Sequence, residues 1–159
     1  MILPIALAAG WALLVAVIGA RLTDIGPWYH GLRKPAWQPP NWLFGPAWTV
    51  IFALAATAFV LAWRAAPGGG ARGALIAVYL ANGALNILWN PLFFTLRRPD
   101  WALFEVPLLW LSIAAAIVFV APLSPAAAWL LLPYLVWVSF ASVLNLAIVR
   151  RNRPFGAAR

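Results

Sequence analysis

Residues 42–63 read WLFGPAWTVIFALAATAFVLAW, a run that contains no charged side chain and ends immediately before Arg64. About 20 mainly apolar residues are enough for a helix to cross the hydrocarbon core of a bilayer. In that core the backbone must satisfy its own hydrogen bonds, and the run lacks the polar–apolar alternation of a membrane barrel strand. We therefore predict a transmembrane helix over residues 42–64.

Four further apolar runs, each with at most one charge, predict helices over residues 2–21, 73–96, 101–121 and 126–149. The first run lacks the basic segment and the cleavage site of a signal peptide, so we interpret it as a retained helix. Of the 159 residues, 65% are hydrophobic and 9% are charged, which is more apolar surface than a soluble domain of this size can bury. The predicted fold class is all-α integral membrane: a single domain (residues 1–159) folded as a five-transmembrane-helix bundle.

The longest connection, residues 22–41, differs in composition from the glycine- and serine-rich linkers that stay flexible. It contains four prolines and three aromatic residues, namely Pro27, Pro35, Pro39, Pro40, Trp28, Tyr29 and Trp37. We expect this loop to fold over one end of the bundle and to cap a pocket there. Residues 150–159 form a basic C-terminal tail.

The basic residues are distributed unequally between the two ends of the predicted bundle. One side carries Arg21, Arg33, Lys34, Arg97, Arg98, Arg150, Arg151, Arg153 and Arg159, and the other carries only Arg64 and Arg72. Because cytoplasmic loops are enriched in Lys and Arg, we expect the N-terminus outside and the C-terminus in the cytoplasm. The charges flank apolar runs and form no single stripe, so nucleic acid is not a predicted partner. Inner and outer bacterial membranes both stay open.

The chain contains eleven tryptophans, and those at Trp28, Trp37, Trp42, Trp63, Trp101 and Trp129 fit the usual enrichment at membrane interfaces. Trp11, Trp89, Trp110 and Trp137 lie well inside their spans, and Trp48 lies nearly two turns inside. A deep indole needs a partner for its N–H and atoms around its ring. Two interpretations stay open: the deep rings line a cavity for a flat guest, or they fill the core against alanine-rich helices.

Polar residues follow one face of the third predicted helix. Asn82, Asn86 and Asn90 are spaced at i, i+4 and i+8, so they share a face that should point into the bundle. They serve either as hydrogen-bonded links between helices or as a polar wall for a ligand, and both readings stay open. On the fifth helix, Tyr134, Trp137, Ala141 and Asn145 share a face by the same geometry.

Small residues at four-residue spacing occupy the start of the third helix, at Gly73, Ala77 and Ala81. Such a pattern permits close packing of two membrane helices. It is a weak signal on its own, and it predicts a homodimer through this helix.

Catalytic and metal chemistry find little support in the sequence. The chain has one histidine, His30, and three acids, Asp24, Asp100 and Glu105, without metal-ligand spacing. No metal and no required cofactor are predicted; His30 as a haem-iron ligand is the less favoured alternative to a solvated loop residue. We expect Glu105 near the headgroups, paired with Arg97 or Arg98. The lack of deep ionisable residues counts against proton-coupled transport.

Three segments together resemble the translocator protein family, also known as tryptophan-rich sensory proteins (TspO) or peripheral benzodiazepine receptors. The first comprises WY at 28–29, LRKPAWQPP at 32–40 and FGPAWT at 44–49. The second comprises LN at 85–86, Trp89 and PLFF at 91–94, and the third comprises PYLVW at 133–137 and LN at 144–145. The resemblance covers essentially the whole chain, and the arginine- and alanine-rich composition favours a bacterial member.

The resemblance implies a five-helix bundle with a pocket roofed by the first loop and a dimer through the third helix. It also implies binding of protoporphyrin and haem-like tetrapyrroles, sterols, and isoquinoline-carboxamide or benzodiazepine-type drugs. Trp48 and Trp137 match the paired pocket tryptophans of the family, Asn86 with Asn82 matches its polar wall, and Ala141 matches a position that must stay small. Trp37, Trp89 and Tyr134 complete the predicted ligand-binding set. Arg33 and Lys34 are placed at the pocket mouth, where we expect them to meet propionates.

One departure concerns sterols. Leu144-Asn145 is followed by Leu146, and no tyrosine precedes Arg150, so the cholesterol motif of vertebrate members is incomplete here. The predicted function is a membrane receptor or sensor for porphyrins and other flat hydrophobic ligands. A carrier of the same ligands is the first alternative. The second is an enzyme-like breakdown of porphyrins, driven by light or oxygen, in which Trp48 and Trp137 act; an enzyme is the less favoured reading.

Overall fold

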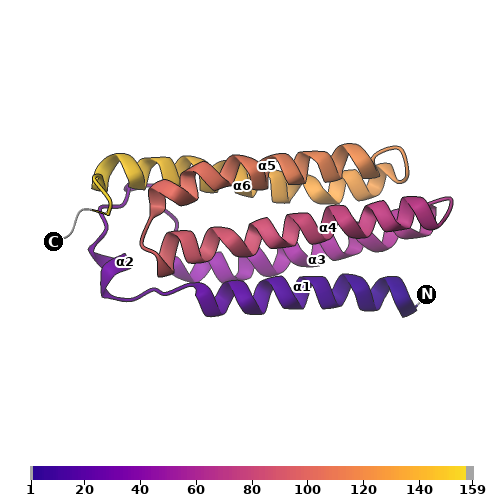
Figure 1. Cartoon of the computed structure of the whole chain (residues 1–159), viewed down its shortest axis with the longest axis horizontal. Helices are drawn as coiled ribbons and strands as arrows, with labels where there is room; N and C mark the ends of the chain where they lie inside the picture. Colours follow the sequence, from indigo (N-terminus) through magenta and orange to yellow (C-terminus); the bar gives the residue numbers. More distant parts are fainter. Residues whose placement is uncertain (1, 157–159) are drawn as a thin grey trace.

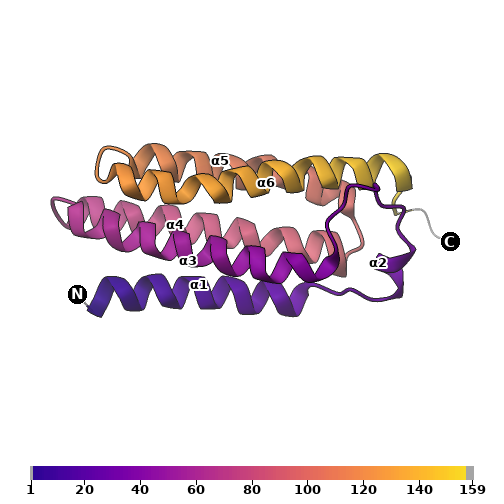
Figure 2. The same cartoon turned by 180° about the vertical axis from the view of Figure 1, so that it is seen from behind.

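A computed structural model describes residues 2–156. Its elements are α1 (Ile2–Leu22), α2 (Pro27–Gly31), α3 (Asn41–Ala65), α4 (Gly69–Asn90), the π-helical segment η1 (Pro91–Thr95), α5 (Pro99–Val120) and α6 (Pro125–Asn152). Five helices are long and apolar enough to cross a membrane, and they lie side by side in one bundle (Figures 1 and 2). The predicted fold, an integral membrane five-helix bundle, is confirmed. Arg159, which entered the orientation argument, lies outside the described residues.

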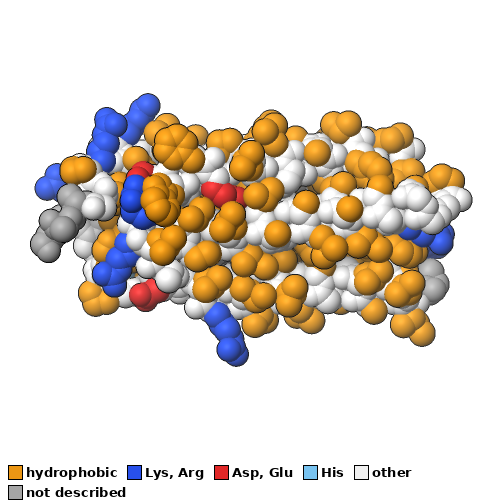
Figure 3. All heavy atoms as spheres, in the orientation of Figure 1, with side chains coloured by type: hydrophobic (Ala, Val, Ile, Leu, Met, Phe, Trp, Pro, Cys, Tyr) orange, Lys and Arg blue, Asp and Glu red, His pale blue; other side chains and the backbone are white. Residues whose placement is uncertain are grey.

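The outer surface of the bundle is apolar because the helices are apolar on nearly all sides. Leu13, Leu14 and Val17 of α1 are each at least half exposed, as are Leu108 and Val118 of α5. A helix that is hydrophobic all round belongs in lipid or in a large core. Figure 3 shows hydrophobic side chains along the flank of the bundle, whereas most visible Lys and Arg side chains gather at the end that carries α2 and the C-terminus.

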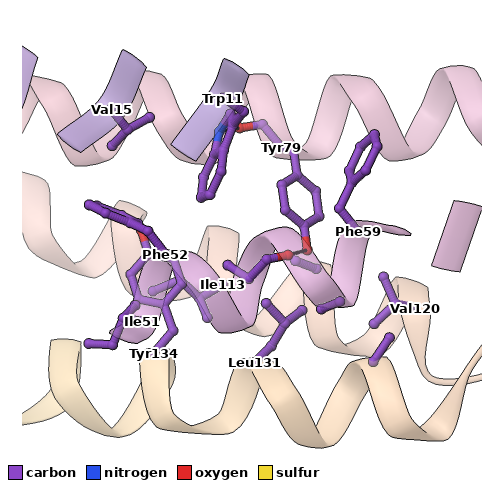
Figure 4. Close-up of a cluster of buried hydrophobic side chains, with 14 of the residues drawn as sticks. Trp11, Val15, Ile51, Phe52, Phe59, Tyr79, Ile113, Val120, Leu131 and Tyr134 are labelled. Carbon is purple, nitrogen blue, oxygen red and sulfur yellow. Dashed lines mark hydrogen bonds between the residues drawn. The ribbon is translucent and has the colours of Figure 1, made fainter. Parts of the chain in front are cut away.

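The main packed core joins all five long helices, and the contacts among α1, α3 and α4 are its most polar part. Trp11 Nε1 donates a hydrogen bond to the carbonyl oxygen of Tyr79 at 2.8 Å, and Tyr79 OH donates to the carbonyl oxygen of Ala55 at 2.9 Å (Figure 4). Phe52 packs edge-on against Trp11 at 5.8 Å between ring centroids. Gly83 lets α1 approach α4 closely, because a Cβ atom there would lie 2.6 Å from Trp11 Nε1.

One end of the bundle is closed by the loop between α1 and α3, as the sequence predicts. Tyr29 of α2 is buried together with Phe93, Phe94, Leu144 and Ile148. The same end contains the main departure from regular helix. The chain turns π-helical from Pro91, a residue without an N–H to donate, and the amide of Leu96 closes a hydrogen bond to the Pro91 carbonyl at 2.8 Å. Phe93 and Phe94, two adjacent residues of this segment, are both buried.

Two helix ends differ from the predicted bounds by three residues or more. α4 begins at Gly69 rather than at residue 73, and α6 extends to Asn152 rather than to residue 149. The extension of α6 carries Arg150 and Arg151 in its last turn, where cations interact favourably with the helix dipole. Asn152 thereby comes within hydrogen-bonding distance of the capping loop.

Candidate ligand-binding site

A cavity of about 520 Å³ lies inside the capped end of the bundle, within the range usual for small-molecule sites. All five long helices and the capping loop contribute to it. Its aromatic lining consists of Tyr29, Phe44, Trp48, Phe52, Trp89, Phe93, Phe94 and Trp137, and its polar lining includes Thr23, Gln38, Asn41, Asn86, Asn90 and Asn145. Within the part of the chain that the structure describes, no group of His, Cys, Asp or Glu residues has a metal-binding arrangement.

One wall of the cavity is built from aromatic rings of α3 and α6. The rings of Trp48 and Trp137 meet edge to face, with 6.3 Å between centroids and 82° between planes. Trp48 stacks on Phe52 at 5.2 Å, and Phe44 packs against Trp137 at 5.7 Å. On α4 and η1, Trp89 stacks on Phe93 at 4.8 Å. These rings offer large apolar faces, the surface that a flat ring system needs for stacking.

A buried chain of polar side chains links α4, α5 and α6 beside this wall. Asn86 Nδ2 donates to Tyr134 OH at 2.9 Å, Tyr134 OH donates to Asn82 Oδ1 at 3.1 Å, and Asn82 Nδ2 donates to Ser112 Oγ at 2.8 Å. Of these residues, only Asn86 also lines the large cavity. Asn82 and Tyr134 are instead bonded to each other and lie against a small apolar void of about 10 Å³. They act as links between helices, and Asn86 connects those links to the cavity.

Replacing Tyr134 with phenylalanine tests the structural role of this chain of hydrogen bonds. The change removes the hydroxyl that bonds both Asn82 and Asn86. Because interhelical hydrogen bonds in membranes are worth about 0.6 kcal/mol on average, we expect a loss of stability of about 1 kcal/mol for the pair. Unfolding of purified protein in mixed micelles measures it. An equally stable variant would contradict the role, and Tyr134→Phe should leave the cavity volume intact.

The other amides near the cavity also have partners in the protein. Asn90 Nδ2 donates to the carbonyl oxygen of Asn86 at 3.0 Å, and Thr23 Oγ1 donates to Asn90 Oδ1 at 3.0 Å. The Asn145 amide, oriented to satisfy both of its groups, donates to the carbonyl oxygen of Pro99 at 3.1 Å and accepts from Leu103 N at 3.2 Å. Asn145 therefore ties the start of α5 to α6.

Three polar side chains hold the roof of the cavity in place. Tyr29 OH donates to Asn41 Oδ1 at 3.0 Å, and Gln38 Nε2 donates to Tyr29 OH at 3.1 Å. Burial raises the pKa of Tyr29, and the bond from Gln38 opposes that rise. The phenol therefore stays protonated at neutral pH, so it can donate to Asn41.

Arg33, Lys34 and Trp37 lie outside the cavity lining, on the loop itself. Lys34 Nζ donates to the carbonyl oxygen of Tyr29 and sits 4.2 Å from the centroid of the Tyr29 ring, and burial lowers the pKa of this ammonium. Arg33 is exposed, and Trp37 packs against Phe140 at 5.7 Å. All three stabilise the roof, and contact of the two cations with propionates stays a prediction.

The deep tryptophans separate into two groups. Trp48, Trp89 and Trp137 line the cavity, together with the small Ala141. Trp11 fills the core, and Trp110 Nε1 donates to Ser139 Oγ at 2.8 Å on the α5–α6 face. Some deep indoles therefore line a cavity and others fill the core, and a flat guest in that cavity stays a prediction. His30 is exposed and does not line the cavity, and Gly73, Ala77 and Ala81 are exposed along α4.

The predicted pairing of Glu105 is wrong. Arg98 Nε bonds Asp100 Oδ1 at 2.8 Å, and the guanidinium of Arg97 lies 6.0 Å from the centroid of the Trp28 ring. Glu105 is 5% exposed, and neither carboxylate oxygen has a hydrogen-bond partner among the described residues. Asp100 lies only two residues from Arg98 and forms the ion pair with it. Glu105 lies more than one helical turn further along α5, inside the bundle.

The sequence did not single out Tyr29, Gln38, Asn41, Phe44, Phe52, Phe93 and Phe94 as cavity residues. Phe44 precedes Trp48 by four residues and Phe52 follows it by four. This spacing puts all three on one helix face, and it could have predicted Phe44 and Phe52 as cavity residues. Phe93 and Phe94 are adjacent, and regular α-helix would separate them by about 100°. Both rings are nevertheless buried within the π-helical segment η1.

Comparison with known proteins places the whole bundle in one family. The family model described as TspO/MBR matches residues 4–151. The human translocator protein is 41% identical over 136 residues, covering 83% of this chain and 79% of the human protein. The tryptophan-rich protein TspO of Archaeoglobus fulgidus is 40% identical over 129 residues (81% and 82%), and that of Chlorobaculum tepidum is 36% identical over 153 residues (95% and 97%). The chain is therefore an integral membrane protein that belongs to the TspO/MBR family.

Proposed function

We propose that this protein is a membrane receptor for flat hydrophobic molecules, with protoporphyrin IX and haem-like tetrapyrroles as its principal ligands. The observation that carries the proposal is the cavity of about 520 Å³ walled by Trp48, Trp89 and Trp137. Its aromatic faces suit a planar ring system, and the amides of Asn86 and Asn90 offer polar groups to the edge of a guest. Sterols and isoquinoline-carboxamide or benzodiazepine-type drugs are further candidates of the same shape class.

The relatives support a sensory role. The protein of Cereibacter sphaeroides that is 37% identical over 150 residues is named a tryptophan-rich sensory protein. We further propose that the basic end of the bundle, with the cavity and the C-terminus, faces the cytoplasm. A homodimer through the exposed small residues of α4 belongs to the same proposal, since that face is free to pack against a second copy.

Absorbance of protoporphyrin IX, added to the purified protein in lipid nanodiscs, tests the binding proposal. We expect a saturable shift of the porphyrin absorption band, complete near one porphyrin per chain. A shift that rises linearly and equals that of empty nanodiscs would show that the porphyrin only dissolves in lipid. Sterol and benzodiazepine-type competitors in the same assay should displace the porphyrin if they share the cavity.

The name of the human relative, translocator protein, favours a carrier as the second candidate. Flux of protoporphyrin IX into protein-containing vesicles distinguishes the two, because a receptor binds without moving its ligand. Porphyrin breakdown under illumination is the third candidate and rests on the contact between Trp48 and Trp137. Porphyrin breakdown is supported if illumination lowers the porphyrin absorbance with the parent protein, and if Trp48→Phe still binds porphyrin but no longer lowers that absorbance. Binding by the parent protein without any fall in absorbance would contradict it.

A further inference from the structure

The exposed residues of the cavity lining lie on one side of the bundle. Four of its lining residues are exposed, and these are Ala20, Ile25, Gly45 and Thr49. They come from the end of α1, the start of the loop and the first half of α3. The lining residues of α4, η1, α5 and α6 are all buried or half-buried. A residue that faces both the cavity and the outer surface marks a break in the wall.

The geometry of α3 places this break beside α1. Phe52 of α3 contacts Trp11 of α1 at 5.8 Å between centroids, whereas Phe44 of α3 contacts Trp137 of α6 at 5.7 Å. The two edges of the cavity-facing side of α3 therefore point to α1 and to α6. Gly45 precedes Phe52 by seven residues, close to two full turns, so it lies on the edge that faces α1.

The side chains explain why the seam between α1 and α3 is closed at one end and open at the other. Away from the loop, Trp11 and Phe52 fill the space between the two helices. Nearer the loop, α1 presents Ala20, and α3 presents Gly45, where a Cβ atom would meet nothing within 4 Å. Neither position supplies a large side chain to the wall, and Ile25, the large residue among the four exposed lining residues, stays 44% exposed.

The roof of the cavity is fastened more firmly than this side. Arg33 N donates to Asn152 Oδ1 at 2.8 Å, and Asn152 Nδ2 donates to the carbonyl oxygen of Arg33 at 2.9 Å, which ties the middle of the loop to the end of α6. Tyr29 is 7% exposed and bonded to Asn41. A ligand that entered beneath the loop would have to break these contacts, and passage between α1 and α3 breaks none of them.

We infer that the cavity opens sideways into the bilayer through a port between α1 and α3, framed by Ala20, Gly45 and Thr49, and that ligands enter from the hydrocarbon phase. The partner of this opening is the lipid that surrounds it and the apolar molecules dissolved there. The ligand class rests on the proposed function, whereas the port rests on the cavity alone. A flat molecule concentrated in lipid thus reaches the tryptophans without crossing water.

A cysteine in the cavity reports on the port without any assumption about the natural ligand. The chain contains no cysteine, so Ala141→Cys provides a single thiol on the cavity wall. N-pyrenylmaleimide dissolves in the bilayer of a nanodisc and alkylates that thiol. In this background, Gly45→Trp places a large ring in the port. The matched control is Gly10→Trp, because Gly10 is exposed on α1 and also has nothing within 4 Å of its Cβ position.

We expect Gly45→Trp to slow alkylation of the cavity thiol about tenfold or more, since an obstructed path raises the barrier, and Gly10→Trp to leave the rate unchanged. Asn152→Ala, which removes both bonds to Arg33, should also leave the rate unchanged. An unchanged rate in Gly45→Trp would overturn the port, as would a faster rate in Asn152→Ala, which indicates entry beneath the loop. Thr49→Trp replaces Gly45→Trp if the latter does not fold.

Protoporphyrin IX added before the maleimide separates the port from the proposed function. Protection of the thiol by the porphyrin supports the shared cavity. Absence of protection, together with slow alkylation in Gly45→Trp, would contradict porphyrin binding and leave the port standing. Protection with an unchanged rate in Gly45→Trp would contradict the port and leave the proposed function standing.

Discussion

Gly83→Val is expected to destabilise the bundle by about 3 kcal/mol, because the new side chain overpacks a site where one atom already does not fit and breaks a buried hydrogen bond. A Cβ atom at Gly83 would lie 2.6 Å from Trp11 Nε1 and 3.1 Å from Val15 Cγ2. The Trp11 ring cannot move away without losing its 2.8 Å bond to the carbonyl oxygen of Tyr79. Reversible unfolding in mixed micelles measures the difference.

Gly10→Val serves as the matched control for that prediction. Gly10 lies in the interior of α1 with nothing within 4 Å of its Cβ position, so the same substitution changes local helix preference without a clash. We expect the control to stay within about 0.5 kcal/mol of the parent, the range usual for surface substitutions. Equal stability of the two variants would show that α1 and α4 do not approach closely at Gly83.

Ala141→Thr is expected to weaken ligand binding by about 1–3 kcal/mol, the usual cost of overpacking and roughly a 5- to 150-fold loss of affinity. Ala141 lines the cavity one turn after Trp137 on α6. A larger residue there removes space beside the tryptophan wall. Ala126→Thr, at an exposed position of the same helix, is the control. Unchanged affinity for protoporphyrin IX in Ala141→Thr would place the ligand elsewhere.

The fold was predictable because membrane spanning is a strong constraint on sequence. Each long apolar run had to be a helix, and the structure has a long helix in each of the five runs. Two ends shifted by three residues or more, since nothing in the glycines before residue 73 or in Arg150 indicates whether a helix continues through them. The capping loop was also predictable, because the prolines and aromatic residues of 22–41 distinguish it from a flexible linker.

The site was predictable only in part, because helix phase alone does not reveal which neighbour each face meets. The face containing Asn82 and Asn86 was found, but its division between structural bonds and cavity lining depends on where Tyr134 lies. The roles of Trp11 and Trp110 likewise depend on partners in other helices. Pro91 inside the predicted third helix indicates a local irregularity, but it does not specify a π-helical segment.

Quenching of tryptophan fluorescence by protoporphyrin IX tests the central claim, that the ligand lies among the cavity tryptophans. The informative comparison is Trp137→Phe, which alters the cavity wall, against Trp110→Phe, which alters a deep indole outside the cavity lining. We expect saturable quenching near one porphyrin per chain, weaker binding in Trp137→Phe, and parental affinity in Trp110→Phe. Quenching that never saturates, or equal loss of affinity in both variants, would contradict it.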